Sequence, residues 1–130
     1  MKHYNVVAAV VCHDGKYLCM QKGKTRFEYT SYKWEFPGGK IEPGETPQQA
    51  LARELMEEME YPVEVGEELV TVNHEYPDFS ITMTAFLCTP KGDANGFKRR
   101  EHADSKWCSK DELKRLNWAA ADIDVVEGIL

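Results

Sequence analysis

The sequence predicts an α/β (α+β) fold, a sandwich in which a sheet of mixed strands has helices on either side. Three observations predict it. Four segments have the apolar patterning and the flanking turn residues of strands. A helix with a strongly acidic face separates the first two of these segments from the last two. Two further helix starts follow the fourth segment.

Length and composition favour one domain, residues 1–130, that buries its own core. The chain has 130 residues, of which 42% are hydrophobic and 29% are charged, so it resembles neither a disordered nor a membrane-spanning chain. Its 16 basic and 22 acidic residues give a net charge of −6, which repels a nucleic-acid backbone. We therefore expect neither a nucleic-acid polymer nor a membrane as a partner.

The first two strands are predicted at residues 3–12 and 16–21. Asp14-Gly15 between them is among the dipeptides most typical of a tight hairpin turn. Residues 6–12 are apolar but short and lack a small-x-small cleavage pattern, so a buried strand fits them better than a signal peptide. No CxxC spacing is present, and reduced thiols in a cytoplasmic protein are expected for Cys12, Cys19, Cys88 and Cys108.

A basic loop is predicted at residues 22–33, after the second strand. Four basic residues against one acidic residue give it a local charge of +3 in an otherwise acidic chain. Aromatic residues alternate with these cations, a combination that suits the phosphates and the base of a nucleotide. A plain solvated loop is an equally open interpretation. The basic and aromatic residues are Lys22, Lys24, Arg26, Phe27, Tyr29, Tyr32 and Lys33.

A helix follows that loop, and its start is marked by capping residues. Thr46 is a good N-cap, Pro47 suits the first helical position, and Gln49 completes a capping box. Pro62 marks the end of the helix. One side of the helix is apolar and is expected to pack on the sheet; it comprises Leu51, Ala52, Leu55, Met56 and Met59.

Three carboxylates share the neighbouring arc of this helix. Glu54, Glu57 and Glu58 lie at positions i, i+3 and i+4, so they project from one side. Like charges at this spacing destabilise a helix by roughly 0.2–0.5 kcal/mol per pair, which favours a compensating cation. Carboxylate oxygen is the ligand that Mg²⁺ and Mn²⁺ prefer, so we predict a divalent-metal site. The alternative is a solvated acidic face.

Two further strands are predicted at residues 63–72 and 79–88. The second alternates cleanly, with Phe79, Ile81, Met83, Ala85 and Leu87 on one face. Residues 92–96 form a turn-rich loop. Ser109 opens a short helix with Glu112 as its capping-box partner, and a last helix is predicted to begin near Asp122.

The glycine-rich loop and the acidic helix together resemble the signature of the Nudix hydrolases. The signature residues that this chain supplies at matching spacing are Gly39, Glu45, Arg53, Glu54, Leu55, Glu57 and Glu58. Two positions depart from the pattern, because Glu60 replaces the usual glycine and Tyr61 replaces the closing aliphatic residue. If Glu60 keeps the left-handed helix exit of the family, its side chain costs on the order of 1 kcal/mol.

Residues 34–40 and 101–123 extend the resemblance to the MutT and CTP pyrophosphohydrolase branch of that family, which includes 8-oxo-dGTP diphosphatases. The resemblance implies an α/β/α sandwich with a mixed sheet. It implies that Glu54, Glu57, Glu58, the Gly38 carbonyl and the distant Glu101 hold the metal. Glu45 and Arg53 would complete the catalytic set as a buttress that orients the acidic helix, since a guanidinium fork can fix a carboxylate rotamer. An ordinary surface ion pair is the alternative for these two residues.

The resemblance also implies a set of substrate-binding residues. Lys22 stands where relatives commonly place a phosphate-binding arginine, and it keeps the charge without the bidentate fork. Asp122 stands at the base-selecting position; an ionised aspartate only accepts hydrogen bonds and would favour a base edge rich in donors. An N-cap of the last helix is the alternative role for Asp122. Trp34, Glu35 and Phe36 complete the set, with core packing as the alternative for the two aromatic residues.

The implied activity is Mg²⁺-dependent hydrolysis of a nucleoside triphosphate to the monophosphate and pyrophosphate, with Mn²⁺ as a substitute metal. CTP, dCTP or oxidised nucleotides such as 8-oxo-dGTP are the expected substrates, in a monomer or a homodimer that sanitises nucleotide pools. Glu54 is assigned as the general base, with Glu101 as the alternative. Hydrolysis of a nucleotide sugar or a dinucleotide, and a non-catalytic nucleotide-sensing module, remain open. His74 and His102 show no clear partner in the sequence, so structural or surface roles are expected for both.

Overall fold

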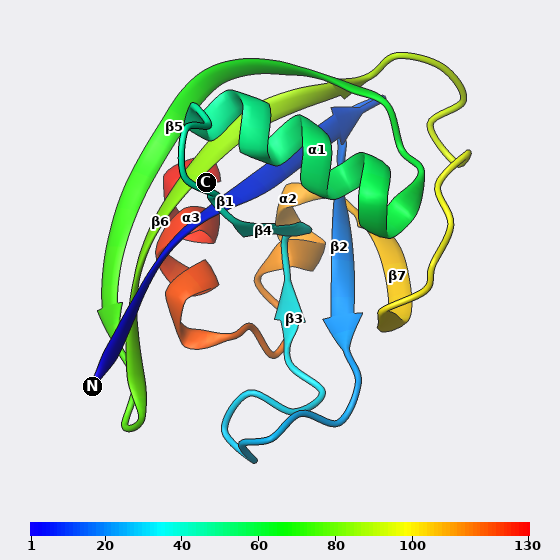
Figure 1. Cartoon of the computed structure of the whole chain (residues 1–130). Coiled ribbons are helices and arrows are strands. Elements are labelled where there is room, and N and C mark those ends of the chain that lie inside the picture. Colours follow the sequence, from blue (N-terminus) through cyan, green and yellow to red (C-terminus); the bar gives the residue numbers. More distant parts are fainter.

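A mixed sheet with helices on both faces forms the molecule, as the sequence predicts (Figure 1). The computed structural model describes all residues, Met1–Leu130. The strand order is β3-β2-β1-β6-β5, with β4 added beside β1 and β7 beside β2. In chain order the elements are β1 (Lys2–His13), β2 (Lys16–Lys22), β3 (Trp34–Glu35), β4 (Gly38–Lys40), α1 (Pro47–Met59), β5 (Val63–Glu75), β6 (Phe79–Pro90), β7 (His102–Cys108), α2 (Lys110–Leu113) and α3 (Ala120–Ile129).

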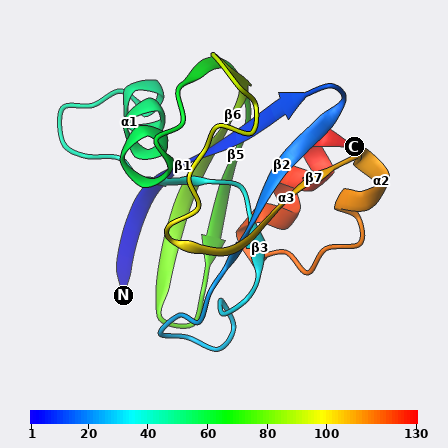
Figure 2. The ribbon, with the colours of Figure 1, turned by 90° about the vertical axis from the view of Figure 1, so that its right-hand side faces the viewer.

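The helices divide between the two faces of the sheet. Figure 2 shows α1 on one side, with α2 and α3 on the other. The central strand β1 is apolar on both faces, because Val7 and Ala9 pack toward α1 while Ala8 and Val10 pack toward α3. This double burial explains the continuous apolar run near the N-terminus.

Strand β1 has both parallel and antiparallel neighbours. It runs parallel to β6 and antiparallel to β2 and β4. The turn between β1 and β2 has positive φ angles at Asp14 (51°) and Gly15 (73°), the conformation that a two-residue type I′ hairpin needs. The predicted hairpin at Asp14-Gly15 is therefore confirmed.

Helix α1 begins and ends where the sequence predicts. The side chain of Thr46 accepts from the backbone N–H of Gln49, and the side chain of Gln49 accepts from that of Thr46. At the other end Glu60 has the left-handed conformation, with φ 48° and ψ 42°. Tyr61, in place of an aliphatic residue, is buried, and its hydroxyl donates to the Ala94 carbonyl at 2.7 Å.

Three short strands were not predicted. β3 and β4 have two and three residues, too few for an alternating pattern, and β7 is mostly polar. The last helix, predicted to begin near Asp122, begins at Ala120 with Ala119 as its N-cap, so Asp122 lies within its first turn. An N-cap role for Asp122 is therefore wrong.

None of the helices has the length and apolarity that a bilayer span requires. All four cysteines are free thiols, and Cys19, Cys88 and Cys108 are buried. Burial raises the pKa of Cys88 to about 12 and also raises the pKa of Cys19 and Cys108. These thiols are therefore poor nucleophiles at neutral pH.

Candidate active site

Arg53 on α1 is tied to the loop that precedes the helix. Its Nε donates to Glu45 Oε2 at 2.6 Å and its Nη2 donates to Glu45 Oε1 at 2.9 Å, a bidentate pair. The two side chains are only 21% and 18% exposed, so this is not a loose surface ion pair. Hydrogen bonds from Arg53, and then from the Glu42 N–H, hold the pKa of Glu45 below its usual range. The Nη2 atom also donates to the Lys40 carbonyl at 3.0 Å, which fixes α1 to β4.

The same guanidinium holds two of the predicted metal-site carboxylates. Arg53 Nη1 donates to Glu54 Oε1 at 3.0 Å and to Glu57 Oε2 at 3.1 Å. Glu57 is 61% exposed, whereas Glu54 is largely covered. The geometry is that of a buttress: Glu45 fixes Arg53, and Arg53 fixes the rotamer of Glu54.

Glycine at positions 38 and 39 lets β4 approach both β1 and the acidic helix. A β-carbon on Gly39 would lie 2.4 Å from Cδ of Glu54, and one on Gly38 would lie 1.9 Å from the Val7 carbonyl oxygen. Neither distance is sterically allowed. The Glu54 carboxylate therefore occupies space that any other residue at position 39 would fill.

Glu54 and Glu58 form a close pair of like charges. Burial, and then the neighbouring Glu54 carboxylate, raise the pKa of Glu58 to about 7. Glu101 adds to this shift and His102 opposes it, so both residues lie within electrostatic reach of Glu58. These two carboxylates are partly buried, and the Arg53 guanidinium that contacts Glu54 is shared with Glu45 and Glu57. A cation bound here would stabilise the ionised forms.

The predicted metal set is brought together only in part. No group of three or more Asp, Glu, His or Cys side chains has metal-ligating spacing in this conformation. Glu57 is hydrogen-bonded to Arg53. The chemistry of the site nonetheless fits a hard divalent cation. The Glu54–Glu58 pair supplies oxygen donors and excess negative charge, and the glycine cradle leaves the Glu54 carboxylate unobstructed.

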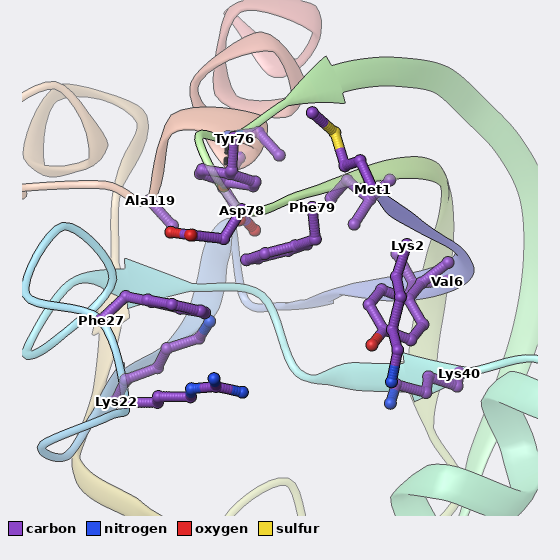
Figure 3. Close-up of a pocket in the computed structure, with 15 residues that line it drawn as sticks. Met1, Lys2, Val6, Lys22, Phe27, Lys40, Tyr76, Asp78, Phe79 and Ala119 are labelled. Atoms are coloured by element: carbon purple, nitrogen blue, oxygen red, sulfur yellow. Dashed lines mark hydrogen bonds between the residues drawn. The ribbon is translucent and has the colours of Figure 1, made fainter.

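A cavity of about 800 Å³ lies on the opposite face of the sheet, beside the first residues of β1 and β6 (Figure 3). Alternation along β4 connects it with the acidic helix: Gly39 lies against Glu54, while the next residue, Lys40, lines the cavity. In Figure 3, Phe27 and Lys22 approach from one side and Lys2 and Lys40 lie on the other. The wall between them is aromatic and aliphatic, and includes Tyr4, Val6, Tyr76, Phe79 and Ile81.

The basic loop of residues 22–33 closes one side of this cavity. Phe27 stacks on Tyr29 with ring centroids 5.2 Å apart and on Phe79 at 5.9 Å, and Tyr29 stacks on Tyr76 at 5.8 Å. The Tyr29 hydroxyl donates to Asp78 Oδ2 at 2.7 Å. The loop is therefore docked on the turn between β5 and β6, with Lys22 and Phe27 in the cavity wall.

Asp122 is buried at the base of the cavity. Its Oδ1 accepts from the backbone N–H of Phe36 at 3.0 Å. Burial, and then the charge of Glu35, raise the pKa of Asp122 to about 8. At neutral pH this carboxyl group keeps its proton, so it offers a donor as well as an acceptor, unlike the ionised aspartate assumed from the sequence.

The other predicted substrate residues do not line the cavity. Phe36 is buried and stacks on Trp118 with ring centroids 4.8 Å apart, and Trp34 packs against the same core. The Glu35 carboxylate lies between the side chains of Lys22 and His102. Its Oε1 is 3.5 Å from Lys22 Nζ, and its Oε2 is 2.9 Å from His102 Nε2.

His102 thus has a partner, Glu35, that the sequence did not indicate. Its partner lies 67 residues earlier in the chain, and only the pairing of β7 and β3 with the two edges of β2 brings the two together. No spacing in the sequence signals such a contact. His74, by comparison, makes an edge-to-face contact with Tyr76 at 4.4 Å.

Known proteins resemble this chain in sequence and in fold. Residues 1–128 match the family model of the NUDIX domain. The chain is 36% identical over 131 residues to the CTP pyrophosphohydrolase of Escherichia coli (strain K12), a match that covers 100% of this chain and 93% of that protein. It is 41% identical over 90 residues to the 8-oxo-dGTP diphosphatase of Proteus vulgaris, covering 68% of this chain and 78% of that protein.

A solved structure gives the same result. The MutT protein (family Nudix hydrolase) from methicillin-resistant Staphylococcus aureus 252 matches with a TM-score of 0.75 and 39% identity, covering 99% of this chain and 97% of that chain. Nudix hydrolases generally use divalent metal ions, in agreement with the donor chemistry at Glu54 and Glu58. With its family match, its relatives and its fold in accord, this chain belongs to the Nudix hydrolases.

Proposed function

We propose that this protein is a Mg²⁺-dependent nucleoside triphosphate pyrophosphohydrolase that releases a nucleoside monophosphate and pyrophosphate. One observation carries the proposal. Strand β4 contacts the Glu54–Glu58 pair on one face of the sheet through Gly39, and lines a cavity of about 800 Å³ on the other face through Lys40. A cavity of that size with an aromatic wall and several cations suits a nucleotide. The whole site lies in one domain, residues 1–130.

Five groups would hold the metal: the carboxylates of Glu54, Glu57, Glu58 and Glu101 and the carbonyl of Gly38. A bound Mg²⁺, or Mn²⁺ in its place, offsets the charge of the polyphosphate and lowers the pKa of the attacking water. Glu57 would have to leave Arg53 to join this set. That rotation is inexpensive, because the Glu57 side chain is 61% exposed and no packed neighbour has to move.

The protein supplies orientation and a place for the proton. Arg53 occupies Oε1 of Glu54, which leaves Oε2 to accept the proton of the attacking water as the bond from phosphorus to the pyrophosphate oxygen breaks. Glu101 is the alternative base. On the cavity side Lys22, Arg26 and Lys40 provide positive charge for the phosphates.

The base of the nucleotide would stack in the aromatic part of the cavity. Phe27 and Phe79 offer ring faces, and the protonated Asp122 offers a donor and an acceptor to a base edge. The names of the relatives favour CTP or 8-oxo-dGTP as substrates. We expect dCTP, which presents the same base as CTP, to be a candidate as well. We expect the protein to act on nucleotide pools in the cytoplasm, as a monomer or a homodimer.

A side-by-side turnover screen tests the proposal. Release of pyrophosphate in Mg²⁺ would be measured for CTP, dCTP, 5-hydroxy-dCTP, dGTP, 8-oxo-dGTP and ADP-ribose. We expect one or more of the triphosphates to be the best substrate. A strong preference for ADP-ribose, or no turnover of any triphosphate, would contradict the assignment.

Matched substitutions locate the activity. Glu54→Gln and Glu57→Gln should each reduce turnover by about 10²-fold or more with little loss of folded protein, because they remove a base or a ligand but keep the side-chain volume. Glu64→Gln on the exposed edge strand β5 makes the same chemical change away from the site and should leave turnover unchanged. Full activity in both site variants would exclude this site.

A further inference from the structure

We propose that His102 is a positioning residue for substrate binding: it fixes the Glu35 carboxylate, which in turn holds Lys22 at the wall of the nucleotide cavity. This inference rests on the proposed function, because Lys22 matters only if the cavity binds a nucleotide. It gives a role to a buried histidine that neither the metal site nor the cavity wall uses directly.

The contacts form one chain from the interior to the cavity. His102 Nε2 donates to Glu35 Oε2 at 2.9 Å, since a carboxylate can only accept. The other oxygen of Glu35, Oε1, is 3.5 Å from Lys22 Nζ. Lys22 lines the cavity, on the side opposite Lys40 in Figure 3. Each oxygen of Glu35 therefore has one partner, and the histidine is the more deeply buried of the two partners.

The burial of the three side chains indicates that His102 orients Glu35, and that Glu35 orients Lys22. The side chain of His102 is 6% exposed, that of Glu35 is 23% exposed and that of Lys22 is 30% exposed. A lysine has a long, flexible side chain and a contact of 3.5 Å does not fix it by itself. The buried imidazole is the one member of the chain whose position the packed sheet determines, so the carboxylate takes its orientation from it.

The sheet register aims the three side chains at one another. His102 pairs with Lys22 across β7 and β2, immediately after a break in the register between Gln21 and Lys22. Glu35 pairs with Met20 across β3 and β2. A register break of this kind redirects the side chain that follows it, and such breaks are common beside functional sites. Three strands thus meet at the edge of the cavity with their polar groups in contact.

The alternative role for His102 is support of the acidic helix α1, because the imidazole lies within electrostatic reach of Glu58. The two roles make opposite kinetic predictions. Loss of the Glu35 contact weakens ground-state binding of the triphosphate and raises KM. Loss of support for the acidic helix lowers kcat and leaves KM nearly unchanged.

Two amide substitutions test the hydrogen bond itself. In His102→Gln the side-chain amide reaches the position of Nε2 and can still donate to Glu35, whereas in His102→Asn the amide reaches only the position of Nδ1. We expect His102→Asn to raise KM for the best triphosphate substrate about 10-fold with kcat changed by less than about 2-fold, as for loss of one hydrogen bond to a charged group. His102→Gln should stay within about 3-fold of the wild-type KM for the same reason.

Two controls separate positioning from general damage. His13→Gln removes another histidine that lies beside a carboxylate, 3.3 Å from Asp14 on the exposed hairpin turn, and should leave both constants unchanged. Because positioning acts through Glu35, His102→Asn should add no further increase in KM to a Glu35→Gln variant. Thermal unfolding of each variant shows that it is folded.

Three results would overturn the inference: equal KM values for His102→Asn, His102→Gln and wild type; a fall in kcat with KM unchanged; or additive effects of the Glu35 and His102 changes. If the wild-type protein hydrolyses no triphosphate, the proposed function fails and the inference fails with it. If the wild-type protein hydrolyses a triphosphate but the His102 variants keep its KM, the inference is refuted and the proposed function stands.

Discussion

At the scale of residues, the surrounding atoms explain why position 39 is glycine and why Asp122 keeps its proton. Gly39 is needed because the Glu54 carboxylate lies where its β-carbon would be. Asp122 keeps its proton at neutral pH because it is buried and faces the charge of Glu35. Both are therefore better tested by small changes in size or charge than by truncation.

Gly39→Ala should displace Glu54, the proposed general base. The added β-carbon would lie 2.4 Å from Cδ of Glu54, so the carboxylate must move away from Arg53. A shift of that kind in a catalytic group lowers kcat by about 10²-fold. The measurement is pyrophosphate release together with thermal unfolding. Gly92→Ala is the control, because an added β-carbon there meets nothing within 4 Å and should leave kcat unchanged. Equal kcat in both variants would contradict the cradle at Gly39.

Asp122→Asn should remove part of the pH dependence of stability. The folded protein binds the Asp122 proton with a pKa of about 8, against an ordinary value of 3.8, so the folded state binds more protons between these values. Stability from this group is full below about pH 4 and is lost as the pH rises toward about 8. Urea unfolding from pH 5 to pH 8 should therefore show the wild type losing stability relative to Asp122→Asn. Parallel curves for the two proteins would contradict the raised pKa.

At the scale of elements, α1 is the part on which the chemistry depends, and each of its ends is fixed differently. The capping box at Thr46 and the Arg53–Glu45 pair fix its start, while a left-handed residue ends it. That residue is Glu60, whose carboxylate makes ion pairs with Lys98 and Arg100. The helix end thus combines backbone strain with surface charge pairs, and the two contributions oppose each other.

Glu60→Gly and Glu60→Ala separate these contributions. Both remove the ion pairs, which are exposed and worth little, but only glycine also relieves the left-handed strain. We expect the glycine variant to be more stable than the alanine variant by about 1 kcal/mol in urea unfolding. Equal stability of the two variants would show that the backbone at position 60 carries no strain. Turnover should change little in either, because no metal ligand is removed.

At the scale of the molecule, the sheet separates the two halves of the site and β4 joins them. The acidic helix lies on one face and α3 lies on the other (Figure 2). The cavity is on the α3 face, because Ala119, Ala121 and Asp122 line it. Each face has its own apolar core, so we expect neither core to depend on a metal ion for folding. Removal of the proposed metal should therefore abolish activity without unfolding the protein.

Chelation tests that separation. EDTA should abolish pyrophosphate release, and added Mg²⁺ or Mn²⁺ should restore it, while the thermal midpoint without nucleotide shifts by only a few degrees. Calorimetric binding of a nonhydrolysable triphosphate should depend on the same ions. Metal-independent binding and turnover would contradict the metal site, and unfolding by EDTA would contradict the independence of the two cores.

The sequence by itself determined the elements whose signals are local. The Asp14-Gly15 turn, the capping box at Thr46 and the carboxylate row on α1 each depend on residues within a few positions of one another. Helix and turn geometry relate such residues directly, so their spacing is enough to predict them. The short strands β3 and β4 gave no comparable pattern.

Tertiary structure alone decided the contacts between distant strands and the charge states that follow from burial. The His102–Glu35 hydrogen bond spans 67 residues and depends on strand register, which no local spacing encodes. The proton on Asp122 and the raised pKa of Glu58 depend on which neighbours exclude water. A pKa is set by the surrounding dielectric and charges, and these exist only once segments far apart in the chain have packed together.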